Sequence, residues 1–238
     1  KYLIPEDILM ENAGLSACSV IKDRYGIRHN SFLIICATGN NGGDGLVVAR
    51  SIHSRGGKVI VFILGNREKY KSTSRVNLDR LLSTAVEVFD LSQDASSLDR
   101  FKEALKNRNI IVDAIFGTGL AREVKGFYAD IINLINESGK KVVSLDIPSG
   151  INGNTGQIMG SSVKADVTIT FGLPKYGNLL YPGFDQCGKL YVTHISFPPP
   201  LYNDESIKVY INIPPQLKKR DPVGYKGSFG DVLFIAGS

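Results

Sequence analysis

Residues 37–45 read Ala37-Thr38-Gly39-Asn40-Asn41-Gly42-Gly43-Asp44-Gly45, between an apolar run at 31–36 and an apolar-periodic segment at 46–52. This order predicts a buried strand, a glycine-rich turn and a helix. Free backbone N–H groups at such a turn, together with the helix dipole, favour a bound anion. Glycine lets the backbone approach a ligand, and the asparagine amides both donate and accept hydrogen bonds. We therefore predict a ligand site at this turn.

Two common nucleotide fingerprints are missing from this turn. It lacks the Gly-x-Gly-x-x-Gly spacing of the dinucleotide turn, and no Gly-Lys-Ser/Thr follows to form a P-loop. An ordinary dehydrogenase and a sugar or nucleotide kinase are therefore disfavoured. A simpler alternative is a tight turn in which Asn41 or Asp44 caps the helix. The clustering of glycines, asparagines and an aspartate at one strand end favours a ligand site instead.

The composition is that of an ordinary globular protein, with 238 residues, 43% of them hydrophobic and 21% charged. This length gives one large domain or two small ones. The three cysteines, Cys18, Cys36 and Cys187, are far apart and lie partly within apolar runs. Free buried thiols are therefore expected rather than disulfides or a metal cluster. A reducing compartment suits such thiols, and we expect a cytoplasmic protein.

Several classes of function are disfavoured by what the sequence lacks. His29, His53 and His194 have no metal-ligand spacing, which argues against a zinc site or a Ser-His-Asp triad. The net charge of +5 is spread along the chain, so nucleic acid is not an expected partner. No apolar run is long enough to cross a membrane, and residues 1–20 do not resemble a signal peptide. A homo-oligomer is left open.

Short apolar runs rich in Val and Ile alternate with helical patterns along the chain. The predicted strands are 31–36, 58–64, 86–89, 109–115, 141–145 and 166–171, and the predicted helices are 5–25, 43–55, 72–82, 96–106 and 126–138. This alternation predicts a three-layer αβα, Rossmann-like sandwich with a mainly parallel, doubly wound sheet. In the usual strand order, 3-2-1-4-5-6, a crevice opens between the first and fourth strands.

The fourth and fifth predicted strands each end in an aspartate followed by a glycine-containing loop, at Asp113 and Asp146. Adjacent strands lie about 4.8 Å apart, so we expect the two carboxylates to repel each other unless one is protonated or a cation lies near. Asn41, Asp113 and Ser149 offer hard ligands, which favour an alkali or alkaline-earth ion. The alternative is that each aspartate only caps the following helix or turn.

Five separated motifs together resemble the YjeF amino-terminal family. They are LMENAG at 9–14, NNGGDG at 40–45, DAIFGTG at 113–119, DIPSG at 146–150 and FGLPK at 171–175. The resemblance spans about residues 1–197. One departure is at the front, where the match begins late in the first helix region, so an upstream turn of the family's pattern is absent.

The resemblance implies an NAD(P)H-hydrate epimerase, which interconverts the R and S forms of hydrated NADH and NADPH. It implies potassium as the cofactor, with Asn41, Asp113 and Ser149 as its ligands, and Asp146 as the acid/base, with Asp113 as the alternative catalytic carboxylate. The implied substrate contacts are Asn40, Asn41, Gly42, Gly43, Asp44, Gly117, Thr118, Gly119, Leu120, Ala121, Arg122, Glu123 and Asp146. For Lys175, which follows Pro174, we expect a solvent-exposed loop lysine, and the alternative is a contact to a substrate phosphate.

Some relatives of this kind serve as non-catalytic scaffolds associated with protein or RNA. In such a scaffold we expect the polar loop residues and aspartates to be replaced, and here all of them remain. The enzyme is therefore the favoured interpretation.

The last part of the chain suggests a second, incomplete domain. Residues 1–197 form the predicted epimerase domain, and the prolines of 198–220 predict a stiff, extended connector. Residues 221–238 resemble the opening of the ribokinase-like, ADP- or ATP-dependent NAD(P)H-hydrate dehydratase that is fused to the epimerase in bifunctional repair enzymes. One strand and a turn cannot bury their own surface, so no dehydratase activity is expected. The alternative is an edge strand of the first domain.

Overall fold

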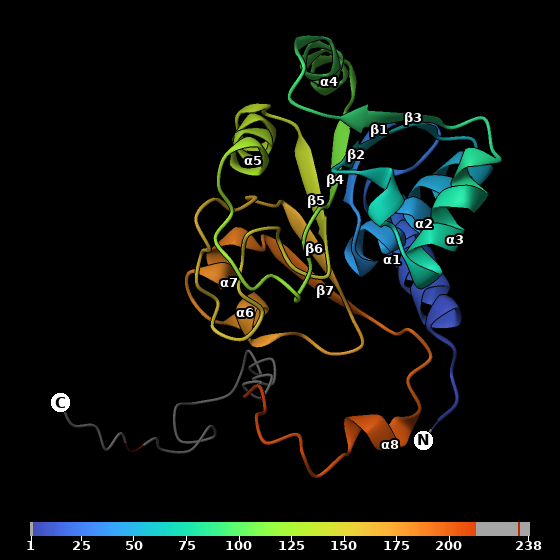
Figure 1. The fold of residues 1–238 in the computed structure, drawn as a ribbon. Helices are drawn as coiled ribbons and strands as arrows, with labels where there is room; N and C mark the ends of the chain where they lie inside the picture. Colours follow the sequence, from blue (N-terminus) through green and yellow to red (C-terminus); the bar gives the residue numbers. More distant parts are fainter. Residues whose placement is uncertain (1, 213–232, 234–238) are drawn as a thin grey trace, which may run out of the picture. The chain divides into compact units, whose positions relative to one another are not determined.

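The computed structural model describes residues 2–212 and 233. The chain divides into two compact units, Lys1–Pro198 and Pro199–Ser238. The first unit is built around a seven-stranded sheet in which every neighbouring pair of strands is parallel, with helices on both faces (Figure 1). The predicted three-layer α/β class is confirmed.

The sheet order is β3-β2-β1-β4-β5-β6-β7. Its strands are β1 (Ser31–Ala37), β2 (Lys58–Leu64), β3 (Glu87–Leu91), β4 (Ile110–Ala114), β5 (Lys141–Leu145), β6 (Val167–Phe171) and β7 (Lys189–Thr193). All six predicted strands and their order are present. The seventh strand was not predicted, because β7 is a half-exposed edge strand and lacks the continuous apolar run of a buried one.

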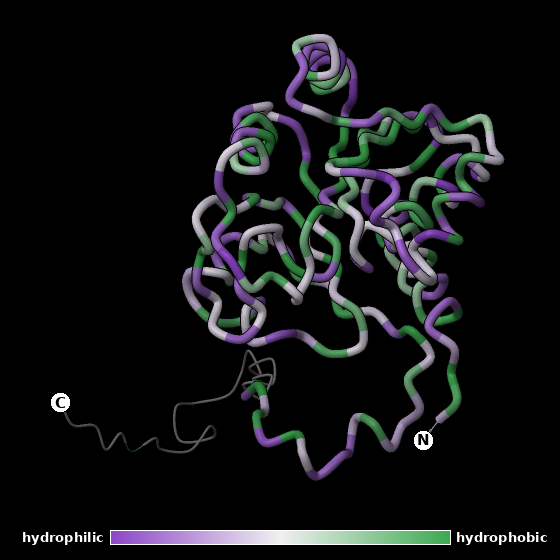
Figure 2. The backbone as a smooth tube through the Cα atoms, in the orientation of Figure 1, coloured by the Kyte–Doolittle hydropathy of each residue, from purple (hydrophilic) through white to green (hydrophobic). Residues whose placement is uncertain are grey.

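Five longer helices cover the two faces of the sheet. They are α1 (Glu6–Tyr25), α2 (Asn40–Ser54), α3 (Ser72–Leu82), α4 (Ala95–Asn107) and α5 (Phe127–Glu137). Buried side chains of α1, α2 and α3 form one core with one face of the central strands, and those of α4 and α5 form a second core with the other face. Figure 2 shows mixed hydrophilic and hydrophobic colours along α4 and α5, as expected of helices that bury one side only.

The strand register brings the ends of β1 and β4 to the same level, because Ile35 pairs with Asp113 and Cys36 with Ala114. After β1 the chain enters α2 on one face, and after β4 it continues to α5 on the other face. Connections that leave in opposite directions open a crevice at the carboxyl ends of these strands. The predicted switch point therefore lies between β1 and β4.

Two glycines of the opening stretch allow α2 to lie close to the sheet. A Cβ atom added to Gly42 would lie 1.7 Å from the carbonyl oxygen of Ala37, and one added to Gly45 would lie 2.5 Å from the Cβ of Ala114. At these two positions the absence of a side chain lets α2 pack closely against the sheet. Gly39 differs from these two glycines, because its added Cβ would meet nothing within 4 Å.

Short elements complete the described chain. They are the 3-10 helix η1 (Arg67–Lys69) and the single turns α6 (Tyr176–Leu179), α7 (Gly183–Gln186) and α8 (Pro199–Tyr202). The extended connector predicted from residue 198 onward is wrong for α8, because proline is well accommodated in the first turn of a helix. The rest of the predicted connector from residue 213, and the predicted start of a second domain apart from Leu233, lie outside the described residues.

All three cysteines are free and buried, as predicted. Within the described part of the chain, no helix combines the length and the apolar character that a membrane span requires.

Replacing Gly42 by alanine is expected to lower the free energy of unfolding by about 1–3 kcal/mol, because the new methyl group meets backbone that cannot move aside. The matched control is Gly119→Ala, at a glycine whose added Cβ would meet nothing within 4 Å, and it is expected to change stability by less than about 0.5 kcal/mol. Thermal unfolding of both variants tests this account. If Gly42→Ala melted at the same temperature as the control, the packing of α2 against the sheet would not require glycine at position 42.

Candidate active site at the carboxyl edge of the sheet

The amide-rich turn begins the helix three residues earlier than predicted. Gly39 is the N-cap of α2, and no side chain forms a cap hydrogen bond there. The alternative in which Asn41 or Asp44 caps the helix is therefore wrong. The N–H groups of a first helical turn have no acceptor within the helix, so they are available for an anionic ligand.

Asn41 is the unusual residue of this turn. It is 7% exposed, and in the described structure neither its amide nitrogen nor its amide oxygen has a hydrogen-bond partner. Buried polar atoms normally find partners. The unsatisfied amide is therefore a candidate contact for a polar ligand or an ion.

Asp113, at the end of β4, is completely buried. Its Oδ1 accepts hydrogen bonds from Ser149 Oγ (2.5 Å) and the Ile115 N–H (3.2 Å). Its Oδ2 accepts from Ser144 Oγ (2.8 Å) and the Ser149 N–H (2.9 Å). Burial raises the pKa of this carboxyl, and the four donors oppose that rise. Asp113 therefore connects β4 to β5 and to the loop after β5. These four hydrogen bonds are more than a carboxylate that only caps a turn would accept.

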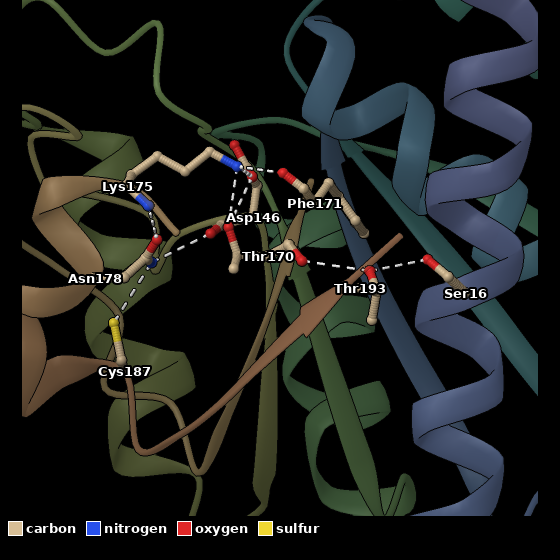
Figure 3. Close-up of polar contacts among 8 residues, drawn as sticks. All are labelled: Ser16, Asp146, Thr170, Phe171, Lys175, Asn178, Cys187 and Thr193. Atoms are coloured by element: carbon tan, nitrogen blue, oxygen red, sulfur yellow. Dashed lines mark hydrogen bonds and ion pairs between the residues drawn. The ribbon is translucent and has the colours of Figure 1, made fainter. Parts of the chain in front are cut away.

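Asp146 lies two residues beyond Ser144, which pairs with Asp113 across β4 and β5. Its φ angle is 65°, a conformation that residues other than glycine rarely adopt. Its Oδ1 accepts an ion-paired hydrogen bond from Lys175 and a hydrogen bond from Thr170 Oγ1 (3.3 Å), as Figure 3 shows. Lys175 is 23% exposed in its side chain, so the expectation of a solvated loop lysine is wrong.

Gly117 lies close to residues of two other predicted motifs, the amide-rich turn at 40–45 and the loop at 146–150. A Cβ added to Gly117 would lie 3.3 Å from the Cβ of Asn41 and 3.8 Å from Oδ2 of Asp146. The loop after β4 thus lies between the amide-rich turn and the aspartate after β5. This convergence is the geometry expected of one site at the switch point.

The carboxylate that interacts electrostatically with Asp146 is that of Asp44. The pKa of Asp44 is raised well above its ordinary value, first by burial and then by the negative charge of Asp146, while Lys175 opposes the rise. The sequence predicted this repulsion for Asp113 and Asp146. Asp44 was not singled out for it because the distance between the helix turn and the loop after β5 cannot be read from the sequence.

The rest of the predicted substrate loop is open to solvent. Thr118, Gly119 and residues 121–123 are exposed, whereas Gly117 and Leu120 are half-buried. Glu123 forms an ion pair with Lys125 (2.5 Å) in which both side chains are largely exposed. Asn40, at the start of α2, is also exposed and donates to Glu6 (2.8 Å). These residues belong to the start of α2 and to the loop after β4, both at the carboxyl edge of the sheet.

The donor set suits a hard cation. Among the described residues, no group of three His, Cys, Asp or Glu side chains is arranged to hold a metal. The unsatisfied Asn41 oxygen and the buried charge of Asp113 instead offer oxygen donors, which alkali and alkaline-earth ions prefer. Ser149 Oγ already accepts from the Phe116 N–H (2.8 Å) and donates to Asp113, which leaves one lone pair of this hydroxyl for a ligand.

Comparison with known proteins gives one family. The family profile described as "YjeF-related protein N-terminus" matches residues 6–177. The "Bifunctional NAD(P)H-hydrate repair enzyme Nnr" of Thermofilum pendens is 43% identical over all of this chain, which spans 45% of that relative. The chain thus covers about half the length of such bifunctional relatives. The "NAD(P)H-hydrate epimerase" of Oenococcus oeni is 35% identical, with 82% of this chain and 88% of that protein covered.

A solved structure agrees with this result. The crystal structure of the yeast protein ynu0 (YNL200c) aligns with a TM-score of 0.64 and 25% identity, covering 78% of this chain and 76% of that one.

The electrostatics of Asp44 predict that Asp44→Asn stabilises the protein at neutral pH. A carboxyl whose pKa is raised in the folded state costs stability as pH increases above its unfolded pKa of about 3.9. The variant is expected to melt about 2–4 °C higher at pH 8, which corresponds to roughly 1 kcal/mol in a domain of this size, and to approach the wild type as the pH falls below about 3.9. Melting curves across this range test it, and a variant that is less stable at pH 8 would contradict it.

Proposed function

Since the chain belongs to the YjeF-related protein N-terminus family, we propose that it interconverts the R and S epimers of hydrated NADH and NADPH. Relatives of similar length bear the name NAD(P)H-hydrate epimerase. The single observation that carries the proposal is the position of Gly117 between Asn41 and Oδ2 of Asp146. A non-catalytic scaffold is not favoured, because it gives no reason to keep a half-buried carboxylate, an ion-paired lysine and an unsatisfied amide at one crevice.

The reaction needs acid/base chemistry beside a developing positive charge. The hydroxyl-bearing carbon is bonded to the ring nitrogen, whose electrons help to expel the hydroxyl. Departure of the protonated hydroxyl as water leaves a planar cation, which another water attacks from either face. One proton is donated and one is recovered, so nothing is consumed.

Asp146 is our proposed acid/base. Of the Asp44 and Asp146 carboxyls, Asp44 has its pKa raised well above the ordinary value, first by burial and then by the negative charge of Asp146. Asp146 is the member whose Oδ2 faces the loop at Gly117. After donating the proton, its negative charge would stabilise the adjacent cation.

The dinucleotide phosphates would bind at the start of α2. There the N–H groups of the first turn are free of helical acceptors, and Asn40 and Gly39 are exposed. The open loop at residues 117–123 would cover the bound dinucleotide. Asp113 is completely buried, and we propose that it supports the site without touching the reacting carbon.

We further propose that potassium is bound by Asn41, Asp113 and Ser149. The unsatisfied Asn41 amide and the buried carboxylate of Asp113 support this. When bound, the ion would supply positive charge that balances Asp113 and favours an anionic substrate.

The free, buried state of all three cysteines supports the cytoplasm as the proposed location.

Asp146→Asn is expected to lower kcat for epimerisation by about 10²–10⁴-fold, the usual contribution of a general acid/base. The assay starts from the pure R epimer and follows the S form by chromatography, against an enzyme-free blank. Asp130→Asn, an exposed residue of α5, is the matched control. If Asp146→Asn kept the full rate while Asp113→Asn lost it without losing potassium, the roles of the two aspartates would be reversed.

Potassium is expected to raise the melting temperature more than sodium at equal ionic strength. At ten times its dissociation constant, a ligand adds about 1.4 kcal/mol, which corresponds to roughly 3–6 °C here. Asn41→Ala should lose most of this difference. Identical melting temperatures of the wild type in the two salts would rule out the proposed ion.

A further inference from the structure

We propose that Lys175 is a positioning residue for Asp146, and that its ammonium group turns the Asp146 carboxylate so that Oδ2 faces the substrate. This inference rests on the proposed function for its activity assays. Its structural content, the orientation of one carboxylate, can be measured without any assay.

The ammonium group of Lys175 has no donor left for a substrate phosphate. Nζ contacts Oδ1 of Asp146, Oγ1 of Thr170 (3.0 Å) and the carbonyl oxygen of Phe171 (3.0 Å). An ammonium group has three protons, and three acceptors account for all of them. Figure 3 shows Nζ among these acceptors at the end of β6. A phosphate contact would require breaking one of these bonds.

The backbones of the two partners are held by a single side chain. Asn178 is completely buried. Its amide oxygen accepts from the Lys175 N–H (2.8 Å), and its amide nitrogen donates to the carbonyl oxygen of Asp146 (3.2 Å). Asn178 therefore ties the Lys175 backbone to that of Asp146, the residue with the left-handed conformation.

The two oxygens of the Asp146 carboxylate have different surroundings. In the described structure, the hydrogen bonds from Lys175 and Thr170 both end on Oδ1. Oδ2 faces Gly117 in the loop after β4. Without Lys175, rotation about the Asp146 side-chain bonds would be less restricted, and Oδ2 would spend less time facing the substrate.

This arrangement predicts a specific kinetic pattern. Lys175→Met keeps the length of the side chain and removes its charge. It is expected to lower kcat at least about tenfold while KM changes less than about twofold, because an orienting contact acts on the transition state and not on dinucleotide binding. A raised KM with unchanged kcat would instead identify a phosphate contact and overturn the inference. Lys102→Met, an exposed lysine on α4, is the matched control.

Restoring the amine tests the role of the ammonium group itself. Lys175→Cys treated with 2-bromoethylamine carries a lysine-like S-aminoethyl side chain, and the treatment should recover most of the lost kcat. The three native cysteines are buried, so treated wild type should keep its rate. Alkylation that restores no activity in a folded variant would contradict the proposal.

Crystal structures separate the failure of this inference from the failure of the proposed function. If the wild type does not epimerise the substrate, the function is wrong. The inference still predicts one carboxylate orientation for Asp146 in the wild type and a rotated or multiple orientation in Lys175→Met. The same single orientation in both would overturn it. If Lys175→Met does not fold, Thr170→Val, which removes the hydroxyl beside both partners, is expected to change the orientation and kcat in the same direction.

Discussion

The candidate site depends on one buried carboxylate. Asp113 lies at the end of β4 without solvent contact, and Ser149 donates to both of its oxygens. Ser149 also accepts from the Phe116 N–H, so the loop that carries Gly117 and the loop that carries Asp146 are fixed to each other. A buried charge is tolerated only when it is fully hydrogen-bonded. The hydrogen bonds from Ser149 therefore have two effects. They stabilise the buried Asp113 carboxylate, and they hold the two loops in place.

A second constraint is electrostatic. Asp44 on α2 and Asp146 after β5 repel each other, while Lys175 interacts favourably with both. Burial and the charge of Asp146 raise the pKa of Asp44 well above its ordinary value, and a carboxyl with a raised pKa suits a reaction that transfers protons. It also costs stability, as is common where function requires charges to lie close together. The lysine limits that cost and, in our proposal, orients the carboxylate.

Much of the fold could be predicted because buried parallel strands have a plain sequence pattern. The runs at 58–64 and 141–145 match β2 and β5 residue for residue. The edge strand β7 was missed because its residues are half-exposed and mixed in polarity. The start of α2 was placed too late because asparagine and glycine are typical of turns, whereas here Gly42 is required by the close approach of Ala37. The aspartates at the strand ends were recognisable, but the burial of Lys175 depends on Asn178 and on a chain path between β6 and β7 that no local pattern predicts.

The central claim is that the start of α2 and the loops after β4 and β5 form one dinucleotide site. The most direct measurement is a crystal structure of this chain with a bound nicotinamide dinucleotide in potassium chloride. We predict that the phosphates contact the first-turn N–H groups of α2 and that the nicotinamide ring lies beside Oδ2 of Asp146. A dinucleotide bound elsewhere, or with its nicotinamide ring away from Asp146, would contradict the account.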